Sequence, residues 1–425
     1  MLRVAMISVH TCPLARLGSR ETGGMNVYVR ELSRHLGSRG VAVDVFTRRQ
    51  ERDVQEAVEF GENARVIHLD AGPPRTIDKY EVLHYLPQFA EGVWDFQRRT
   101  GWSYHLLHSH YWLSGPVATA LAAEWQVPLV VMFHTLGQLK NRVSRNGSER
   151  ENAERIEIER LSMLAADRVV AASPTDMEQM VDFYGALSSR IRVVPGGVDT
   201  ATFHPFPTDV ARALLGLGPG KLVLFVGRIQ QLKGIDLLLR AFARLVSDWS
   251  GEDSPRLMVV GGRNPTDEAD PEAVEMERLR ILACDLGVQD RVTFQRAVPH
   301  SMLPTYYSAA DVVVVPSLYE SFGLVALEAM ACGAPVVASR VGGLQWTVQD
   351  GRSGFLVRRR EPGQFAAAMR LVLQDEALRS SLSREAIEVA QGFSWASAAD
   401  RTLQLYGELA PAHAGCLAAC GEQSC

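Results

Sequence analysis

Short apolar runs without strict polar alternation recur along this chain, separated by longer amphipathic stretches. Three examples are 3–9, 128–134 and 311–316. Runs of this kind indicate strands buried on both faces, which is typical of parallel sheets covered by helices. Because strands and helices alternate in this way in both halves of the chain, we predict an α/β protein with two doubly wound, Rossmann-like domains.

The periodic pattern breaks in the middle of the chain, at about 198–209, where prolines and aromatic residues replace it. Ligands of doubly wound sheets bind beyond the carboxyl ends of the strands, so two facing domains would place an active site in the cleft between them. We therefore expect the following division of the chain: an N-terminal domain over 1–205, a C-terminal domain over 206–392, a helix over 393–410 and a flexible tail over 411–425.

The composition excludes several other classes of protein. Of the 425 residues, 47% are hydrophobic and 22% are charged, so the chain can bury full cores and is neither disordered nor collagen-like. A net charge of −5 does not favour a nucleic-acid or basic membrane-surface protein. No apolar run approaches the ~20 residues that cross a bilayer, and the start reads as a strand rather than a signal peptide. Six cysteines in so long a chain do not suggest a disulfide framework, so we expect a cytoplasmic protein with free thiols.

Paired glycines, Gly23 and Gly24, follow the first predicted strand and open a helix. Glycines let the backbone approach a ligand closely, and the free N–H groups at a helix start favour an anion. A plain tight turn explains the pair equally well. The segment is not the dinucleotide fingerprint, because no GxGxxG follows.

Histidines close two of the predicted strands. His134 ends the run 128–134, at the carboxyl edge where ligands bind, although a lone histidine in this position is often structural. His108 and His110 point to the same face of their strand and could suggest a metal ion. Without a third ligand at suitable spacing, we reject that interpretation and predict no metal site.

Two cations bracket the loop after the first strand of the C-terminal domain. Lysine occurs only at 79, 140, 221 and 233, so 40 of the 44 basic residues are arginine. Lys233 and Arg228 lie at the carboxyl edge of the sheet, where together they could hold a diphosphate. A solvated loop is the alternative.

Two glutamates, Glu320 and Glu328, follow the run DVVVVPS. A separation of eight residues is about two helical turns, so both side chains would share one side of a helix that starts near Phe322. Carboxylates accept hydrogen bonds from sugar hydroxyls, and the first N–H groups of such a helix can bind phosphate. An amphipathic helix with ordinary exposed acids fits the pattern equally well.

Taken together, the motifs GGMNVYV, HSHYWLSG and HTLGQLKN, the Arg228/Lys233 loop and the two glutamates eight residues apart resemble the retaining family 4 glycosyltransferases of the GT-B fold. The resemblance spans roughly 2–410. Within the family the chain is most similar to the D-inositol-3-phosphate glycosyltransferases of mycothiol synthesis, with sucrose-phosphate synthases more distant. It implies that the final helix crosses back onto the first domain.

The resemblance also implies a UDP-linked sugar donor, bound by the C-terminal domain. Arg228, Lys233 and the Gly24 amide would hold the diphosphate, and the amides of Leu324 and Val325 its other phosphate. Fixed cations and helix-start amides can stabilise the charge that grows on a leaving diphosphate, so no cofactor is required. A structural divalent ion on backbone carbonyls is compatible with this scheme.

For the transferred sugar, GlcNAc or glucose, the resemblance assigns Glu320 to the 3- and 4-hydroxyls, His134 to the 6-hydroxyl and Glu328 to the ribose. The catalytic residues it implies are His134, Arg228, Lys233 and Glu320. The donor-binding residues it implies are Gly24, Arg228, Lys233, Glu320, Phe322, Gly323, Leu324, Val325 and Glu328.

The acceptor is expected to be a phosphorylated polyol or sugar, with inositol phosphate preferred over fructose 6-phosphate because sucrose-phosphate synthases usually carry glutamine where Met25 stands. Lys79 and Arg155 also suit an alternative as ordinary surface charges, since Arg155 lies in the charged stretch SERENAERIEIER. The acceptor residues implied by the resemblance are Asn26, Lys79, Tyr111, Thr135 and Arg155.

Other functions remain as alternatives to transfer onto inositol phosphate: a sucrose-phosphate-synthase-like transfer from UDP-glucose to fructose 6-phosphate, a UDP-sugar epimerase, and a two-domain sugar-binding protein. An epimerase would need acids and bases poised at a sugar C–H, and an exported binding protein would carry a signal segment. A homodimer is compatible with the sequence.

Overall fold

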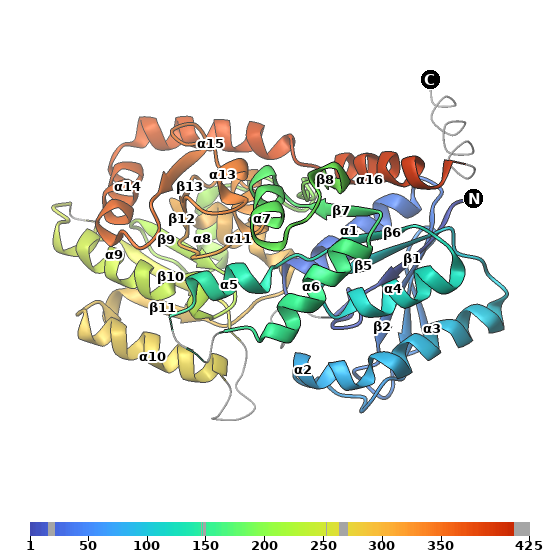
Figure 1. Ribbon diagram of the computed structural model, residues 1–425. Coiled ribbons are helices and arrows are strands. Elements are labelled where there is room, and N and C mark those ends of the chain that lie inside the picture. The colour runs from blue at the N-terminus through green and yellow to red at the C-terminus, as the bar shows by residue number, and fades with distance from the viewer. Residues whose placement is uncertain (16–21, 146, 148–149, 252, 263–270, 412–425) are drawn as a thin grey trace, which may run out of the picture. The chain divides into compact units, whose positions relative to one another are not determined.

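Contacts between residues divide the chain into two units, each built around its own sheet (Figure 1). The N-terminal unit contains the described residues up to Pro195 together with 395–411, and the C-terminal unit contains 196–394. The predicted class of two α/β domains is confirmed. This computed structural model describes residues 1–15, 22–145, 147, 150–251, 253–262 and 271–411.

The sheet of the N-terminal unit has the strand order β3-β4-β2-β1-β5-β6-β7-β8. All neighbouring strands are parallel except β3 and β4. The order reverses between β1 and β5, and ligands of such sheets bind beyond the carboxyl ends of the strands at this point. The strands are β1 (Arg3–Ile7), β2 (Ala42–Arg48), β3 (Ala57–Gly61), β4 (Ala64–Leu69), β5 (Leu106–His110), β6 (Leu129–Met132), β7 (Arg168–Ala171) and β8 (Ile191–Val193).

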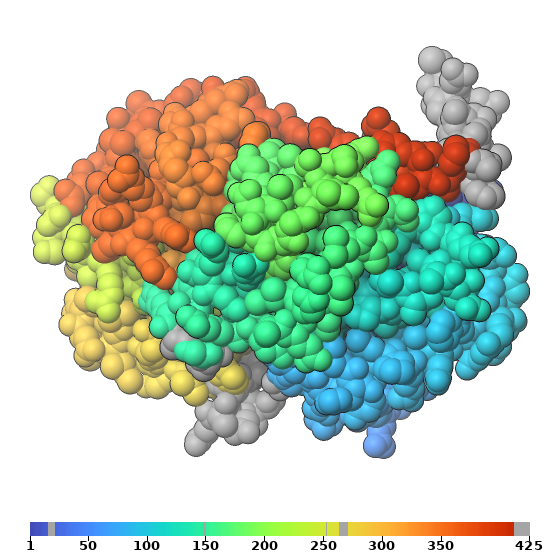
Figure 2. All heavy atoms as spheres, viewed as in Figure 1, coloured from blue at the N-terminus to red at the C-terminus, as the bar shows by residue number. Residues whose placement is uncertain are grey.

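Helices cover this sheet. Among them α1 packs against α16, the last helix of the chain, and α4 packs against α3 and α6. Figure 2 shows α3 and α4, in blue and teal, as a continuous outer surface of the unit. The helices are α1 (Gly24–Gly37), α2 (Lys79–Val82), α3 (Leu86–Thr100), α4 (Ser114–Trp125), α5 (Gly137–Val143), α6 (Ala153–Ala165), α7 (Pro174–Tyr184) and α16 (Trp395–Leu409), with short 3₁₀ turns at Leu83–Tyr85 and Ser188–Arg190.

The sheet of the C-terminal unit is parallel throughout, in the order β11-β10-β9-β12-β13-β14. Counted from its first strand this is 3-2-1-4-5-6, the doubly wound order of nucleotide-binding sheets, with its reversal between β9 and β12. The strands are β9 (Leu222–Val226), β10 (Arg256–Val260), β11 (Val292–Gln295), β12 (Val312–Val315), β13 (Val336–Ser339) and β14 (Gly354–Val357).

Amphipathic helices close the core of this unit. In α9, Leu238, Phe242 and Leu245 are buried, whereas Arg240 and Arg244 on the opposite side are exposed. None of the helices among the described residues combines the length and apolar character that a membrane crossing needs. The helices are α8 (Thr208–Leu214), α9 (Ile235–Ser247), α10 (Pro271–Asp285), α11 (Leu303–Ala309), α12 (Leu324–Ala331), α13 (Leu344–Thr347), α14 (Pro362–Gln374) and α15 (Glu376–Gln391), with 3₁₀ turns at Gln231–Lys233, Gln289–Arg291 and His300–Met302.

One strand was not predicted from the sequence. Strand β3 lies at the edge of the N-terminal sheet, pairs antiparallel with β4 alone, and has no fully buried residue. An edge strand of this kind lacks the continuous apolar run by which the buried parallel strands were recognised.

Candidate active site

Two residues at the carboxyl edge of the N-terminal sheet have left-handed backbone conformations. Tyr111 (φ 73°) directly follows β5, and His134 (φ 59°) lies shortly beyond β6. A non-glycine residue held in a sparsely populated region costs roughly 1–3 kcal/mol, and such residues concentrate at functional sites. Both were singled out in the sequence, His134 for its place at this edge and Tyr111 through the resemblance.

Three histidines meet beneath this edge. His110 Nδ1 lies 3.1 Å from His134 Nε2, and His108 Nδ1 lies 2.7 Å from the hydroxyl of Tyr406 on α16. Burial lowers the pKa of both His108 and His134 to about 3, and it lowers the pKa of His110 well below its usual value. All three rings are therefore neutral near pH 7. A neutral imidazole ring can donate one hydrogen bond and accept another, and it carries no charge.

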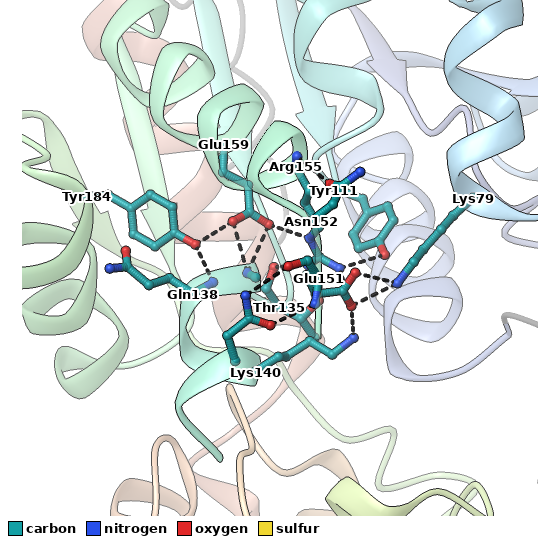
Figure 3. A network of polar contacts seen from close by, with 12 residues as sticks. Lys79, Tyr111, Thr135, Gln138, Lys140, Glu151, Asn152, Arg155, Glu159 and Tyr184 are labelled. Atoms are coloured by element: carbon teal, nitrogen blue, oxygen red, sulfur yellow. Dashed lines mark hydrogen bonds and ion pairs between the residues drawn. The ribbon is translucent and has the colours of Figure 1, made fainter. Parts of the chain in front are cut away.

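Four of the five predicted acceptor residues come together around the start of α6 (Figure 3). Arg155 donates from Nη1 to the Tyr111 hydroxyl at 3.3 Å and from Nη2 to the carbonyl and hydroxyl of Thr135 at 3.1 and 3.2 Å. Lys79 joins the group through Glu151, which also contacts Arg155. Arg155 is fully buried, so the interpretation of Arg155 as a surface charge is wrong.

The centre of this group was missed by the sequence analysis. Glu151 pairs with Lys79 at 2.6 Å and Arg155 at 2.9 Å, and with Lys140, while Tyr80 donates its hydroxyl to the same carboxylate at 2.6 Å. Burial alone raises the pKa of the Glu151 carboxyl, but Arg155, Lys140 and Lys79 outweigh it and hold that pKa well below its usual range. Burial and the neighbouring cations lower the pKa of Lys140 to about 8. Two sequence signals pointed to Lys140, the scarcity of lysine and its place in the motif HTLGQLKN, but neither indicated its partner Glu151.

A second carboxylate, Glu159, holds the other side of Arg155. Its Oε1 lies 2.8 Å from Arg155 Nε, while its Oε2 accepts hydrogen bonds from the Gly137 amide at 2.9 Å and from the Tyr184 hydroxyl. Glu159 and Arg155 are both fully buried. The guanidinium is thus fixed in orientation, with Nη1 and Nη2 directed at Tyr111, Thr135 and Glu151 (Figure 3).

Asn26, the fifth predicted acceptor residue, is engaged elsewhere. Its side chain accepts from the Gly23 amide at 2.9 Å and donates to the Thr11 hydroxyl at 2.8 Å and the Cys12 carbonyl at 2.7 Å. These bonds brace the turn that opens α1. Gly24 begins that helix with exposed backbone, as an anion-binding amide requires, and it belongs to the N-terminal unit.

The C-terminal unit brings Lys233 and Glu320 together at the reversal point of its sheet. Lys233 Nζ lies 2.6 Å from Glu320 Oε2, and the Ser317 hydroxyl lies 3.4 Å from the same oxygen. Gly234 follows with a left-handed backbone (φ 68°), and a Cβ there would lie 2.2 Å from the Pro316 carbonyl oxygen. The loop therefore packs closely against the end of β12. Arg228, in the same loop, is partly exposed.

The expectation that Glu320 and Glu328 share one helix is wrong. Helix α12 begins at Leu324, so Glu320 lies in the preceding loop. Glu328 is on the helix and buried, where His300 Nε2 lies 2.7 Å from one carboxylate oxygen and the Tyr307 hydroxyl donates to the other at 2.9 Å. The two glutamates therefore have separate partners.

The start of α12 is formed by a glycine that no other residue could replace easily. Gly323 has φ 97°, and a Cβ there would lie 2.6 Å from Leu344 Cδ2. The amides of Leu324 and Val325, in the first turn, have no acceptor within the helix and are available to an anion. The Phe322 side chain is buried, with its ring 6.0 Å from that of Phe393, so only its backbone suits a ligand contact.

Comparisons with known proteins identify the family of the chain. A family model described as Glycosyltransferase Family 4 matches residues 22–202, and one described as Glycosyl transferases group 1 matches residues 212–389. The D-inositol 3-phosphate glycosyltransferase of Acidothermus cellulolyticus is 45% identical over 408 residues, which are 95% of this chain and 90% of that protein. The protein of the same name from Kineococcus radiotolerans is 43% identical over 416 residues, 95% and 94% of the two chains.

Solved structures give the same fold. The sucrose-phosphate synthase of Thermosynechococcus elongatus superposes with a TM-score of 0.89 at 35% identity, covering 97% of this chain and all of that one. The HepE protein of Anabaena, solved with UDP and glucose, has a TM-score of 0.74 at 19% identity, covering 96% of this chain and all of that one. At that identity the second likeness shows the fold alone.

Proposed function

The chain belongs to the family 4 glycosyltransferases, and we propose that it moves a hexosyl group, GlcNAc or glucose, from UDP to 1D-myo-inositol 3-phosphate with retention of anomeric configuration. Membership of the family makes it an enzyme that transfers a sugar. The names of its relatives from Acidothermus and Kineococcus support the acceptor, and the UDP and glucose in the HepE structure support the donor class.

The observation that carries the proposal is the group of cations in the N-terminal unit. Lys79, Lys140 and Arg155 converge on a single carboxylate, with the hydroxyls of Tyr111 and Thr135 beside Arg155 (Figure 3). Ammonium, guanidinium and hydroxyl donors directed at one point suit a phosphate oxygen cluster. A neutral polyol would not need them.

The C-terminal unit supplies what a nucleotide sugar needs. Lys233 and Arg228 lie in one loop for the diphosphate, and the amides of Leu324 and Val325 open α12 for its second phosphate. Glu328 presents a buried, oriented carboxylate suited to paired ribose hydroxyls.

In the proposed step, a hydroxyl oxygen of the acceptor attacks the anomeric carbon on the face from which the diphosphate leaves. The bond between the anomeric carbon and the β-phosphate oxygen breaks, and its electron pair stays on UDP. The acceptor proton passes to an oxygen of the leaving phosphate. Lys233 and the α12 amides stabilise the negative charge that grows there. Neutral His134 orients the sugar through its 6-hydroxyl.

Incubation of the enzyme with UDP-GlcNAc or UDP-glucose and each of inositol 3-phosphate, inositol and fructose 6-phosphate tests the proposal. The expected result is UDP release coupled to a new α-glycoside of inositol phosphate, read by NMR of the anomeric proton. A new UDP-sugar without glycoside would indicate epimerisation, and binding without reaction would indicate a sugar-binding protein. Either result would overturn the proposal.

Fructose 6-phosphate is the second candidate acceptor. The similarity to the structure of sucrose-phosphate synthase, with a TM-score of 0.89, favours fructose 6-phosphate as this second candidate. Both acceptors carry a phosphate, so the cation group suits either, and the product analysis above separates them.

A further inference from the structure

The carboxylate of Glu151 occupies the place where an acceptor phosphate would meet its cations. Its Oε1 lies 2.8 Å from Lys79 Nζ and 2.9 Å from Arg155 Nη1, and it also pairs with Lys140. Its Oε2 lies 2.6 Å from Lys79 Nζ and accepts from the Tyr80 hydroxyl at 2.6 Å. Figure 3 shows the lysines and Arg155 directed at this one carboxylate. Both oxygens are engaged by the donors that bind phosphate in proteins.

The backbone of Glu151 is held, but the carboxylate is at the end of a flexible side chain. Asn141, on α5, accepts from the Glu151 amide at 2.7 Å and donates to its carbonyl at 2.9 Å. A move of the carboxylate therefore requires rotation about side-chain bonds, without displacement of the backbone. The Glu151 side chain is 2% exposed, whereas those of Lys79 and Lys140 are 18% and 19% exposed. An anion from solvent would meet the two ammonium groups first.

The charges of the cluster match a phosphate only when Glu151 is absent from it. Lys79, Lys140 and Arg155 carry three positive charges, and Glu159, bound to Arg155 Nε, the Gly137 amide and Tyr184, compensates one of them. The two remaining charges equal those of a phosphomonoester dianion. With the Glu151 carboxylate in place, only one uncompensated positive charge remains. A dianion with three oxygens binds such a group more strongly than a carboxylate does.

We propose that Glu151 is a specificity-determining residue: its carboxylate fills the phosphate subsite when no acceptor is bound, and a phosphorylated acceptor displaces it. Lys140 then becomes a further ligand of the acceptor phosphate. An unphosphorylated polyol has no group to replace the carboxylate, because moving Glu151 away without a substitute leaves the mostly buried Lys79 and Lys140 without this counter-charge. The inference rests on the proposed acceptor but not on the identity of the donor sugar.

Glu151→Gln keeps the shape of the side chain and removes its charge. In phosphate-free buffer the variant is expected to melt below the wild type, since three cations lose their shared carboxylate. Inorganic phosphate and inositol 3-phosphate should raise its Tm more than they raise that of the wild type, and calorimetry should show at least tenfold tighter binding of both. Free inositol should show no such gain.

Two further variants make the comparison sharp. Glu154→Gln removes the same charge from an exposed residue in the first turn of α6 and should bind phosphate as the wild type does. Glu151→Asp shortens the side chain by one methylene, withdraws the carboxylate from the lysines and should also tighten phosphate binding, which covers the case in which Glu151→Gln does not fold. Phosphate binding that is unchanged or weaker in the folded Glu151 variants would show that the glutamate only positions the lysines, and would overturn the proposal.

This outcome is independent of the transferase assay. Tighter phosphate binding by Glu151→Gln, combined with no transfer to inositol 3-phosphate by the wild type, would remove the proposed function but keep Glu151 as the group that occupies a phosphate-binding site. Transfer by the wild type without tighter phosphate binding by the Glu151 variants would keep the proposed function and remove the role of Glu151.

Discussion

Lys233 and Glu320 form an ion pair in the C-terminal unit, with Lys233 Nζ 2.6 Å from Glu320 Oε2. Their side chains are 24% and 20% exposed, so the pair itself adds little to the stability of the fold. Each residue is assigned to a different part of the proposed donor, Lys233 to the diphosphate and Glu320 to the sugar. The ion pair therefore links the residue proposed for the diphosphate to the residue proposed for the sugar. The bond between these two parts of the donor is the one that breaks in the proposed step.

Lys233→Ala is expected to lower kcat by about 10²–10³-fold, as does deletion of one donor to a developing oxyanion. The Tm should change little, because the lost pair is partly exposed. Lys221→Ala is the matched control. It removes another of the four lysines, one that directly precedes β9 and lies outside the loop. Steady-state kinetics and calorimetry measure both effects, and near-normal turnover of Lys233→Ala would contradict the diphosphate assignment.

Glu328→Gln and Glu320→Gln should differ in kind. Contacts to the ribose are similar in the ground and transition states, so Glu328→Gln should raise the KM for the UDP-sugar with little change in kcat. Contacts to the sugar change as its ring flattens, so Glu320→Gln should also lower kcat. Steady-state kinetics with the donor varied at saturating acceptor distinguishes the two. A change confined to the KM of the acceptor in both variants would remove this helix and its preceding loop from the donor site.

The two sheets could be predicted because their strands are apolar on both faces; Val312–Val315, for example, is buried throughout. The start of α12 could not be placed by counting helical turns from Glu320, because it depends on the left-handed backbone of Gly323 and its contact with Leu344. Helix propensity and hydrophobic periodicity indicate neither the backbone conformation of Gly323 nor its contact with Leu344.

The polar centre of the N-terminal unit was only partly predictable. The resemblance identified Lys79, Tyr111, Thr135 and Arg155, and these residues lie together. Glu151 escaped notice because it lies in a run of charges that reads as a solvated surface. Glu151 precedes α6 and is buried among partners from α2 and α5, and no local sequence pattern records these contacts.

Acid should destabilise the N-terminal unit through its buried histidines. Burial lowers the pKa of His108 from 6.5 to about 3 in the folded state, so between these values the unfolded chain binds a proton that the folded chain does not. The stability contributed by neutral His108 is thus complete above pH 6.5 and is lost as the pH falls toward 3, by at most about 1.4 kcal/mol per pH unit. His108→Gln should lose stability less steeply between pH 6.5 and 4.5. Urea unfolding at several pH values measures the slopes, and parallel slopes for the two proteins would contradict a neutral buried His108.

Lys79→Ala tests the acceptor site through its selectivity. The Lys79 ammonium contacts both oxygens of Glu151, at 2.8 and 2.6 Å, and so lies where a phosphate would replace that carboxylate. A hydrogen bond to a charged group contributes about 1.5–3 kcal/mol, which corresponds to a loss of roughly 10–150-fold in kcat/KM for inositol 3-phosphate. The kcat/KM for free inositol should change much less, because that acceptor has no phosphate for Lys79 to bind, and the KM for the UDP-sugar should stay constant. Lys140→Ala should behave in the same way if Lys140 is a phosphate ligand, whereas Lys221→Ala should not. Equal losses on both acceptors would indicate that Lys79 supports the fold of the site instead of binding phosphate, and equal rates of the wild type on inositol and inositol 3-phosphate would remove the phosphate site altogether.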